Sequence, residues 1–259
     1  MKLGVNIDHI AVLREARRVN DPDILEALYV ATRSGADQIT IHLREDRRHI
    51  QDMDAYNIVK HSSLPVNLEC SLDKNILGIV CELAPYRATL VPEKREEITT
   101  EGGLDVLKYQ NEIKKAIELL NTHDIEVSLF VDPDEQMIKS SYELGASMVE
   151  LHTGSFANLF GMLYGSLANS NHSIKELELG RSELKKRFKN SIKELENSAK
   201  YAKSLGLEVA AGHGLNYNNI GYITAIKEIE ELNIGQSIVA RSVFSGLSCA
   251  IKDIKSLIS

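Results

Sequence analysis

The chain has few cysteines, no long apolar run and no excess of positive charge, and each deficit counts against a class of protein. Cys70, Cys81 and Cys249 show no C-x-x-C spacing and are too few for a disulfide framework, so we expect reduced thiols in a cytoplasmic protein. No apolar run approaches the roughly 18 residues of a membrane span, and the opening MKLGVNID lacks the apolar region of a secretory signal. The sequence therefore predicts a soluble protein with no membrane partner.

Acidic residues outnumber basic ones, which gives the chain a formal net charge of -7. This balance argues against nucleic acid as a partner, because binding a phosphate backbone requires a basic face. Small phosphorylated ligands need only a local cationic site. Two arginine clusters follow the first two expected strands and could supply one: Arg14, Arg17 and Arg18, and then Arg44, Arg47 and Arg48.

Four hydrophobic segments end in the same way, with polar residues at alternate positions. The pairs are Asn6 and Asp8, Thr40 and His42, Asn67 and Glu69, and Glu150 and His152. Side chains two residues apart on a strand point to the same face, so each pair aims two polar groups in one direction. A strand covered on both faces is normally apolar throughout, and a buried charge is costly unless it is paired. The pattern indicates a shared polar pocket and hence an enzyme.

The alternation of strand-like and helix-like segments predicts an α/β protein with eight strands. We expect strands at 3–8, 38–43, 65–69, 87–92, 126–132, 148–153, 207–213 and 233–240. Eight βα units in a chain of 259 residues with no Pro/Gly-rich linker favour a single-domain TIM (β/α)8 barrel. A doubly wound open sheet is the alternative, but the glycine-rich stretches at 101–103 and 212–214 match neither G-x-G-x-x-G nor the P-loop.

The stretch between the sixth and seventh expected strands, about 154–206, is unusually long and contains a charged helix at roughly 175–204. We interpret it as a solvated extension of the barrel, and an oligomer contact or a lid is the alternative. The charged loop at 91–103 follows the fourth strand, and it is either a lid over the substrate or plain surface.

Histidines gather at the ends of the expected strands, where TIM barrels place their active sites. His9, His42, His152 and His213 occupy such ends, and His49 lies in the loop after the second strand. Any one of them could be structural, but four at equivalent places indicate function as a group.

Glu69 ends the third strand, where shielding from water would raise its pKa and suit it to act as a general base. Its alternative role is a plain salt bridge. Glu150 and His152 share a face and could pair. Glycines flank His213 and leave backbone N–H groups open to an anion, and the loops after strands seven and eight are a frequent phosphate site.

A metal site is the rival explanation for clustered histidines and carboxylates. The sequence contains neither H-x-H nor H-E-x-x-H, so we predict no metal. A metal-dependent hydrolase or aldolase that uses His42, His152 and His213 as ligands stays open as an alternative. A non-catalytic barrel that binds phosphometabolites is a further one, although it leaves the acid/base groups unexplained.

Long motifs in these same regions resemble the pyridoxine 5′-phosphate synthase family, which forms the vitamin B6 ring. The motifs are GVNIDHIAVLREAR (4–17), ITIHLREDRRHI (39–50), VNLE (66–69), LVPEKREEITTEGGLDV (90–106), VSLFVD (127–132), ELHTG (150–154), AGHGLNYNN (211–219) and ELNIGQSIVARS (231–242). The resemblance implies a TIM barrel without metal or organic cofactor, usually a homo-octamer. It implies a ring-closing condensing transferase that joins 1-deoxy-D-xylulose 5-phosphate to 3-amino-2-oxopropyl phosphate and releases pyridoxine 5′-phosphate, phosphate and water.

The resemblance also implies a role for individual residues. His42 and Glu69 would accept protons, His213 would donate one, and Glu150 would stabilise the transition state. The pentulose phosphate would be bound by Asp8, His9, Arg44, His49 and Thr99, and the aminoketone phosphate by Asn6, Arg17, Gly214, Gly235 and Gln236. Two departures from the family pattern are Gln236, where a histidine is usual, and the segment at about 156–189, which is longer than the usual linker.

Overall fold

The structure, a computed structural model, describes residues 1–93 and 102–259. Its eight parallel strands close into one barrel in sequence order, and each strand pairs with the next. The strands are β1 (Lys2–Asn6), β2 (Gln38–His42), β3 (Val66–Cys70), β4 (Arg87–Leu90), β5 (Glu126–Val131), β6 (Met148–His152), β7 (Glu208–Gly212) and β8 (Glu231–Ile234). The predicted TIM barrel is therefore confirmed, and seven of the eight expected strands agree with the structure to within two residues at either end.

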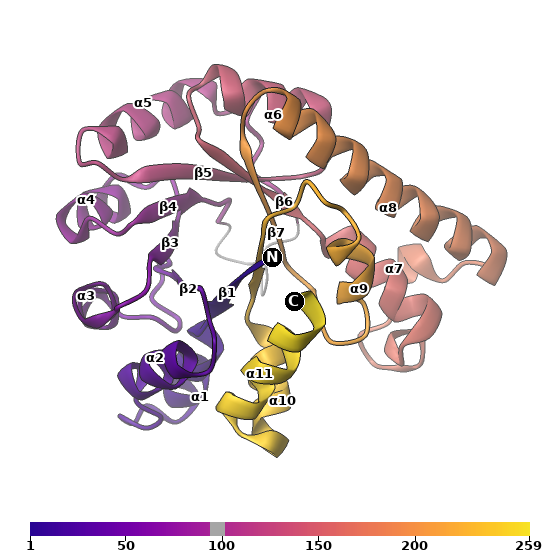
Figure 1. The fold of residues 1–259 in the computed structure, drawn as a ribbon, viewed down its shortest axis with the longest axis horizontal. Coiled ribbons are helices and arrows are strands. Elements are labelled where there is room, and N and C mark those ends of the chain that lie inside the picture. Colours follow the sequence, from indigo (N-terminus) through magenta and orange to yellow (C-terminus); the bar gives the residue numbers. More distant parts are fainter. Residues whose placement is uncertain (94–101) are drawn as a thin grey trace.

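Helices form a ring around this barrel (Figure 1). They are α1 (Asp8–Arg17), α2 (Ile24–Arg33), α3 (Asp52–His61), α4 (Lys74–Leu83), α5 (Gln110–Asn121), α6 (Glu135–Glu143), α7 (Gly154–Tyr164), α8 (Arg181–Ser204), α9 (Ile220–Thr224), α10 (Gln236–Ser245) and α11 (Leu247–Ile258). Gly35, Gly145 and Gly206 each lie between a helix and the strand that follows it. All three have positive φ, which lets the chain turn sharply at the helix end. None of the helices in the two described ranges combines the length and apolar character that crossing a membrane would require.

The eighth expected strand, 233–240, is wrong. β8 begins earlier, at Glu231, and ends at Ile234, and residues from Gln236 onward form α10. The physical reason is the spacing of the buried residues: Ile238 and Val239 are buried while Gln236 and Ala240 are exposed, which is a helical pattern. β1 also ends at Asn6, so Asp8 opens α1 instead of sharing a strand face with Asn6.

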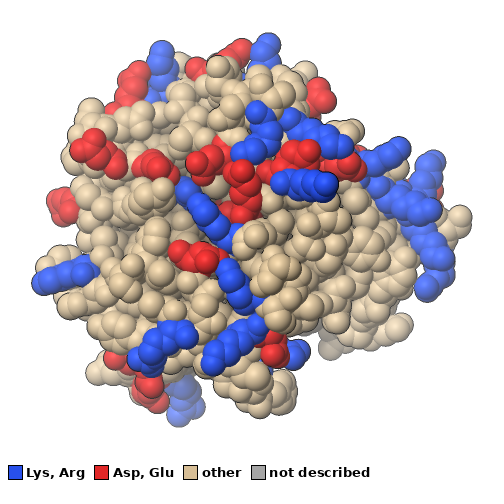
Figure 2. All heavy atoms as spheres, in the orientation of Figure 1, with Lys and Arg blue, Asp and Glu red and all other residues tan. Residues whose placement is uncertain are grey.

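The segment between β6 and β7 consists of α7, two short 3-10 turns at Leu167–Asn169 and Lys175–Leu177, and the long helix α8. The charged helix thus begins at Arg181, later than expected. Its buried residues include Leu184, Phe188 and Leu195, and Phe188 stacks on Phe156 of α7. Figure 2 shows positive and negative side chains interspersed over one face of the molecule, and Lys and Arg gather over α8 at its right-hand edge.

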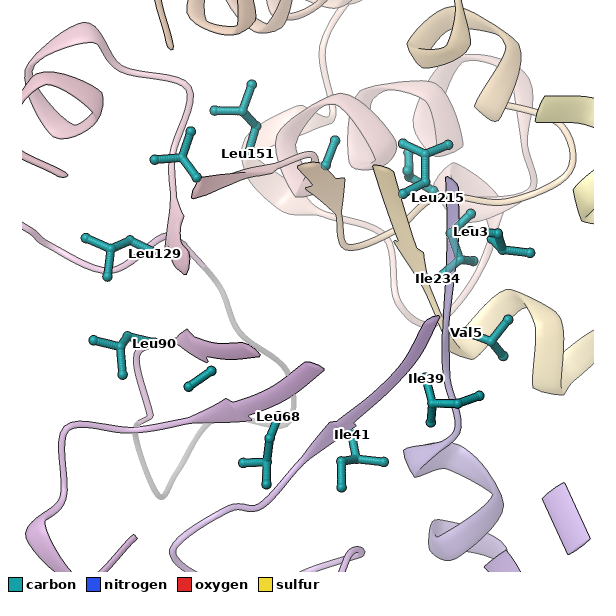
Figure 3. Packing of buried hydrophobic residues seen from close by; sticks show 14 of the residues in the cluster. Leu3, Val5, Ile39, Ile41, Leu68, Leu90, Leu129, Leu151, Leu215 and Ile234 are labelled. Carbon is teal, nitrogen blue, oxygen red and sulfur yellow. The ribbon is translucent and has the colours of Figure 1, made fainter. Parts of the chain in front are cut away.

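The hydrophobic core lies between the barrel and the helices. The strand side chains labelled in Figure 3 point outward from the barrel, among them Ile41, Leu68, Leu90 and Leu129, and all of these are fully buried. Burying a Leu or Ile side chain stabilises the fold by roughly 1.5–3 kcal/mol, so this layer supplies much of the stability. The alternate strand residues point into the barrel.

The barrel interior is unusually polar near the N-terminal ends of the strands. Buried Arg87 of β4 donates to Glu231 of β8 at 3.0 Å, and Gln38 of β2 donates to the same carboxylate at 3.0 Å. Asn233 lies two residues further along β8 than Glu231 and accepts a hydrogen bond from Thr40 at 3.0 Å. Interiors of TIM barrels are usually filled by branched apolar residues. Because buried polar groups are costly unless they are hydrogen-bonded, these polar side chains depend on the bonds that they make to one another.

Candidate active site

His42 and Glu69 lie side by side at the C-terminal ends of β2 and β3. The strand register pairs the two residues directly, so their side chains point to the same side of the barrel. Their closest approach, from His42 Nδ1 to Glu69 Oε2, is 3.8 Å. His42 and Glu69, the two residues predicted to accept protons, are thus neighbours in the structure.

A second carboxylate contacts the other ring nitrogen of His42. Glu93 follows β4, and its Oε1 lies 2.8 Å from His42 Nε2. The other oxygen of Glu93 accepts a hydrogen bond from the backbone N–H of Glu45 at 3.1 Å. His42 therefore lies between two carboxylates, and only Glu69 was singled out from the sequence.

The carboxyls around His42 fall into two electrostatic classes. Burial, together with the nearby charges of Glu150 and Asp8, raises the pKa of Glu69 well above its usual value. Burial also raises the pKa of Asp8 to about 6, against opposing interactions with His42. Burial alone would raise the pKa of Glu93, but its hydrogen bond to His42 and the charges nearby lower it. The pKa values of Glu69 and Asp8 are thus raised towards the neutral range, while that of Glu93 is lowered.

Glu150 points into the barrel from β6 and is almost fully buried. Its Oε2 accepts a hydrogen bond from Asn233 Nδ2 at 2.8 Å. A Cβ at Gly212 would lie 2.1 Å from Glu150 Oε1, so only glycine at that position leaves the carboxylate its place. Burial raises the pKa of Glu150 to about 7, partly offset by the bond from Asn233, and the charge of Glu231 adds to the rise.

The predicted pairing of Glu150 with His152 is wrong. His152 Nδ1 instead lies 2.9 Å from Asp132 Oδ1, which comes from the neighbouring strand end after β5. Asp132 also accepts a hydrogen bond from the backbone N–H of Gly103 at 3.1 Å. The alternate residues of one strand do share a face, but His152 bonds across to the end of the neighbouring strand and Glu150 accepts a bond from Asn233 of β8.

His213 follows β7 with a φ of 78°, in the left-handed region, and its carbonyl accepts a hydrogen bond from Thr153 at 2.6 Å. Its ring lies edge-on to that of His152, with the centroids 5.0 Å apart. Burial, followed by the influence of His152 and His9, lowers the pKa of His213 to about 4. His9 also lowers the pKa of His49.

The residues expected to bind the pentulose phosphate gather beside His42. Arg44 and His49 are both buried, and the rings of His49 and His42 are 6.1 Å apart between centroids. Burial and then the neighbouring His42 and Arg44 lower the pKa of His49 to about 3. His9 is the second residue of α1, and its Nδ1 is buried with no hydrogen-bond partner within the described residues. Thr99 lies outside the described residues.

Three of the residues expected to bind the aminoketone phosphate, Asn6, Gly235 and Gln236, meet at the β8–α10 junction. A Cβ on Gly235 would come within 2.9 Å of the Asn6 side chain, so the two residues are in close contact. Gln236 is the first residue of α10, and Gly214 has a φ of 81°. Arg17 is the exposed last residue of α1 and has no described contact that ties it to this group.

A cavity of about 850 Å³ lies at the opposite end of the barrel from these groups. Its lining includes the first residues of several strands, such as Lys2, Met148 and Glu231, together with the chain termini. Volume therefore does not locate the site, whereas the convergence of buried acid/base groups does. Across residues 1–93 and 102–259, no three His, Cys, Asp or Glu side chains are grouped so that they could hold a metal ion.

Comparison with known proteins shows the family to which the chain belongs. Residues 3–259 match the model of the pyridoxal phosphate biosynthesis protein PdxJ family. Proteins called pyridoxine 5′-phosphate synthase from Sulfurimonas denitrificans and Aliarcobacter butzleri are 67% and 62% identical to it. The alignments cover 100% of this chain and 100% and 99% of the relatives. This chain belongs to the PdxJ family.

Solved structures that resemble the chain show the fold alone. Phosphoribosyl anthranilate isomerase from Thermus thermophilus superimposes with a TM-score of 0.55 at 13% identity, covering 100% of this chain and 98% of the other. A mutant tryptophan synthase α-subunit from Pyrococcus furiosus gives 0.58 at 13% identity, with coverage of 99% and 96%. These sequences are too dissimilar for the likeness to carry a function.

Membership of the PdxJ family bears on the long segment between β6 and β7. The Sulfurimonas denitrificans relative aligns over 259 residues with the whole of both chains, which leaves no room there for a large deletion. The length of the segment therefore does not set this chain apart from that member of the family.

Sequence reasoning missed three residues that contact candidate site residues: Glu93 beside His42, Asp132 beside His152 and Asn233 beside Glu150. Glu93 and Asp132 follow strands β4 and β5, and polar residues just past a strand end were a usable signal for both. Asn233 was hidden because the eighth strand was placed too late. With β8 at Glu231–Ile234, the sequence ELNI shows the same alternation of polar and apolar residues as the other strands.

Proposed function

We propose that this chain catalyses the ring-closing condensation that yields pyridoxine 5′-phosphate. The substrates would be 1-deoxy-D-xylulose 5-phosphate and 3-amino-2-oxopropyl phosphate, and the other products phosphate and water. The observation that carries the proposal is the cluster of buried acid/base groups at the C-terminal end of the barrel, in a chain 67% identical to a pyridoxine 5′-phosphate synthase. Condensation, elimination and ring closure each move protons, which is what such a cluster can do.

In this proposal Glu69 and His42 accept protons from the reacting carbons and amine. A general base works best when its pKa lies near the working pH, and burial moves the pKa of Glu69 in that direction. Glu150, next to the interior stack, would stabilise positive charge that develops on the substrate. Its pKa of about 7 means that it is only partly ionised at neutral pH before substrate binds.

His213 would donate a proton in the same sequence. In the structure its pKa of about 4 keeps the imidazole neutral. Two phosphorylated substrates bring several negative charges into the pocket, and a nearby anion favours the charged form of an imidazole. The proposal therefore includes a rise in the pKa of His213 when the substrates bind.

The two phosphates would occupy separate places. Arg44, His49, Asp8 and His9 lie beside His42 and would hold the pentulose phosphate together with Thr99. The exposed backbone N–H groups at Gly214 and at the start of α10, at Gly235 and Gln236, would hold the aminoketone phosphate with Asn6 and Arg17. A helix N-terminus favours an anion, and a backbone donor at position 236 works with glutamine as well as with histidine.

The remaining features of the proposal are those of the family. We propose a single-domain, cytoplasmic homo-octamer that works without metal or organic cofactor and binds neither nucleic acid nor membrane. Analytical ultracentrifugation of the purified chain tests the assembly, and elemental analysis tests the metal. Stoichiometric zinc or manganese, with activity lost on chelation, would favour a metal-dependent barrel instead.

The direct test incubates the purified chain with both phosphorylated substrates and follows the pyridine absorbance and the release of phosphate. Glu69→Gln and His42→Asn should each lower turnover by at least about 10²-fold with the fold retained. Matched controls are Glu82→Gln and His61→Asn, which change exposed residues of α4 and α3. Near-normal turnover in either site variant would remove the role assigned to that residue. Ligand binding without product would favour a non-catalytic barrel.

A further inference from the structure

Glu93 makes contacts that go beyond those of a surface carboxylate. Its side chain is only 4% exposed, although it comes from the loop after β4. One carboxylate oxygen lies 2.8 Å from His42 Nε2, and the other accepts from the backbone N–H of Glu45 at 3.1 Å. Both oxygens are thus engaged, which fixes the carboxylate plane against the imidazole edge of His42.

These contacts determine which nitrogen of His42 carries a proton. An ionised carboxylate only accepts hydrogen bonds, so the His42 Nε2 that faces Glu93 must be the donor. In the neutral imidazole the lone pair then lies on Nδ1. That nitrogen faces Glu69, with Nδ1 and Oε2 3.8 Å apart. The basic nitrogen of His42 therefore points to the proton acceptor beside it.

We propose that Glu93 is a positioning residue, which holds His42 with Nε2 protonated and stabilises the imidazolium that forms when Nδ1 takes a proton. The inference rests on the proposed function, in which His42 is a proton acceptor. A carboxylate that orients an imidazole and stabilises its charged form without itself touching the substrate has the same logic as the aspartate of a serine protease triad.

Other charged groups around His42 do not replace Glu93. Asp8 accepts from the backbone N–H of His42 at 2.9 Å and so does not bond to its ring, and Glu69 comes no closer to the ring than 3.8 Å. The ring of His49 lies 6.1 Å from that of His42 between centroids. Glu93, with a lowered pKa and a 2.8 Å contact to Nε2, is therefore the carboxylate that bonds directly to the His42 ring.

The test follows the ring nitrogens of His42 by NMR in the intact protein labelled with 15N-histidine, with His42→Asn used to assign its signals. In the parent chain at neutral pH, the shifts should show a proton on Nε2. Glu93→Gln keeps the size of the side chain but removes its charge, so the His42 ring-nitrogen signals should shift away from the pattern of a proton held on Nε2. Glu93→Asp, which keeps the charge, should restore part of this difference.

Steady-state kinetics provide the second readout. Glu93→Gln should lower kcat by about 10–10²-fold with little change in either KM. Glu82→Gln, which removes an exposed carboxylate of α4, should leave the ring-nitrogen signals of His42 and the kinetics unchanged.

Two results would overturn the positioning role. One is a proton on Nδ1 of His42 in the parent chain, a measurement that needs no variant to fold. The other is an unchanged pattern of His42 ring-nitrogen signals in folded Glu93→Gln. A parent chain that makes no pyridoxine 5′-phosphate would instead remove the proposed function, while the NMR spectra would still report whether Glu93 controls His42.

Discussion

The hydrogen bond between Asn233 and Glu150 allows the electrostatics of the site to be tested by a single substitution. Asn233 Nδ2 donates to Glu150 Oε2 at 2.8 Å, in a part of the barrel where both side chains are buried. This bond favours the ionised carboxylate and so holds down a pKa that burial has already raised to about 7. Asn233→Leu removes the donor while keeping the side chain nearly the same size.

The size of the effect follows from the energy of one such bond. A hydrogen bond to a charged group contributes about 1.5–3 kcal/mol, and 1.36 kcal/mol corresponds to one pKa unit, so the pKa of Glu150 should rise by about one to two units. If the ionised form of Glu150 stabilises the transition state, activity is lost as the pH falls through this pKa. The acidic limb of kcat/KM should therefore move to higher pH by the same amount.

The assay is the pH dependence of kcat/KM in the parent chain and three variants. Glu150→Gln should abolish the limb, which assigns it to this residue. Asn67→Leu is the matched control, because Asn67 is also a buried barrel asparagine but bonds to Thr89 at 2.7 Å. A limb that stays in place in Asn233→Leu, or that moves equally in both asparagine variants, would refute the reasoning.

Three further predictions concern stability and binding. Arg87→Met leaves Glu231 buried without its cation, so it should cost about 3–5 kcal/mol and lower Tm by roughly 6–20 °C in a thermal melt; an unchanged Tm would contradict this. The folded chain favours neutral Glu150, so the contribution of this residue to the free energy of unfolding is full below pH 4.5 and is lost as the pH rises through about 7. Urea titrations should therefore show Glu150→Gln gaining about 3 kcal/mol in free energy of unfolding over the parent between pH 4 and pH 8. A constant difference would show that Glu150 is not buried as described. Arg17→Ala should raise the KM for the aminoketone phosphate more than that for the pentulose phosphate, while Arg33→Ala, at the exposed end of α2, should change neither; the reverse order would exchange the two phosphate sites.

Much of the barrel could be predicted from local sequence because its signals are local. Apolar alternation and glycines after helices place a strand without knowledge of its neighbours, and Gly35, Gly145 and Gly206 do have the positive φ that such helix ends use. The error in β8 has the same origin. The run NIGQSIVA is rich enough in β-branched residues to resemble a strand, and only the burial of Ile238 and Val239 together shows a helix.

The partners of the site residues could not be predicted in the same way. His42 and Glu69 were identified because each ends a strand, but their pairing depends on the register between β2 and β3. The bond that Asp132 accepts from His152 likewise joins two strand ends that are 20 residues apart in sequence. A residue's position along its own strand gives the face it points to, whereas its hydrogen-bond partner depends on the stagger of the whole barrel.

The division of each strand into two faces separates the origin of stability from the origin of chemistry. In β3, Leu68 points outward into the apolar layer (Figure 3), while the next residue, Glu69, lies beside His42 at the barrel end. A buried carboxyl with a raised pKa opposes folding once it ionises, so the polar interior is tolerable only because the outer layer stabilises the barrel independently. The same burial brings the pKa of Glu150 to about 7 and so makes it useful near neutral pH. Replacing these interior carboxyls with apolar residues would therefore be expected to strengthen the fold and abolish the proton transfers.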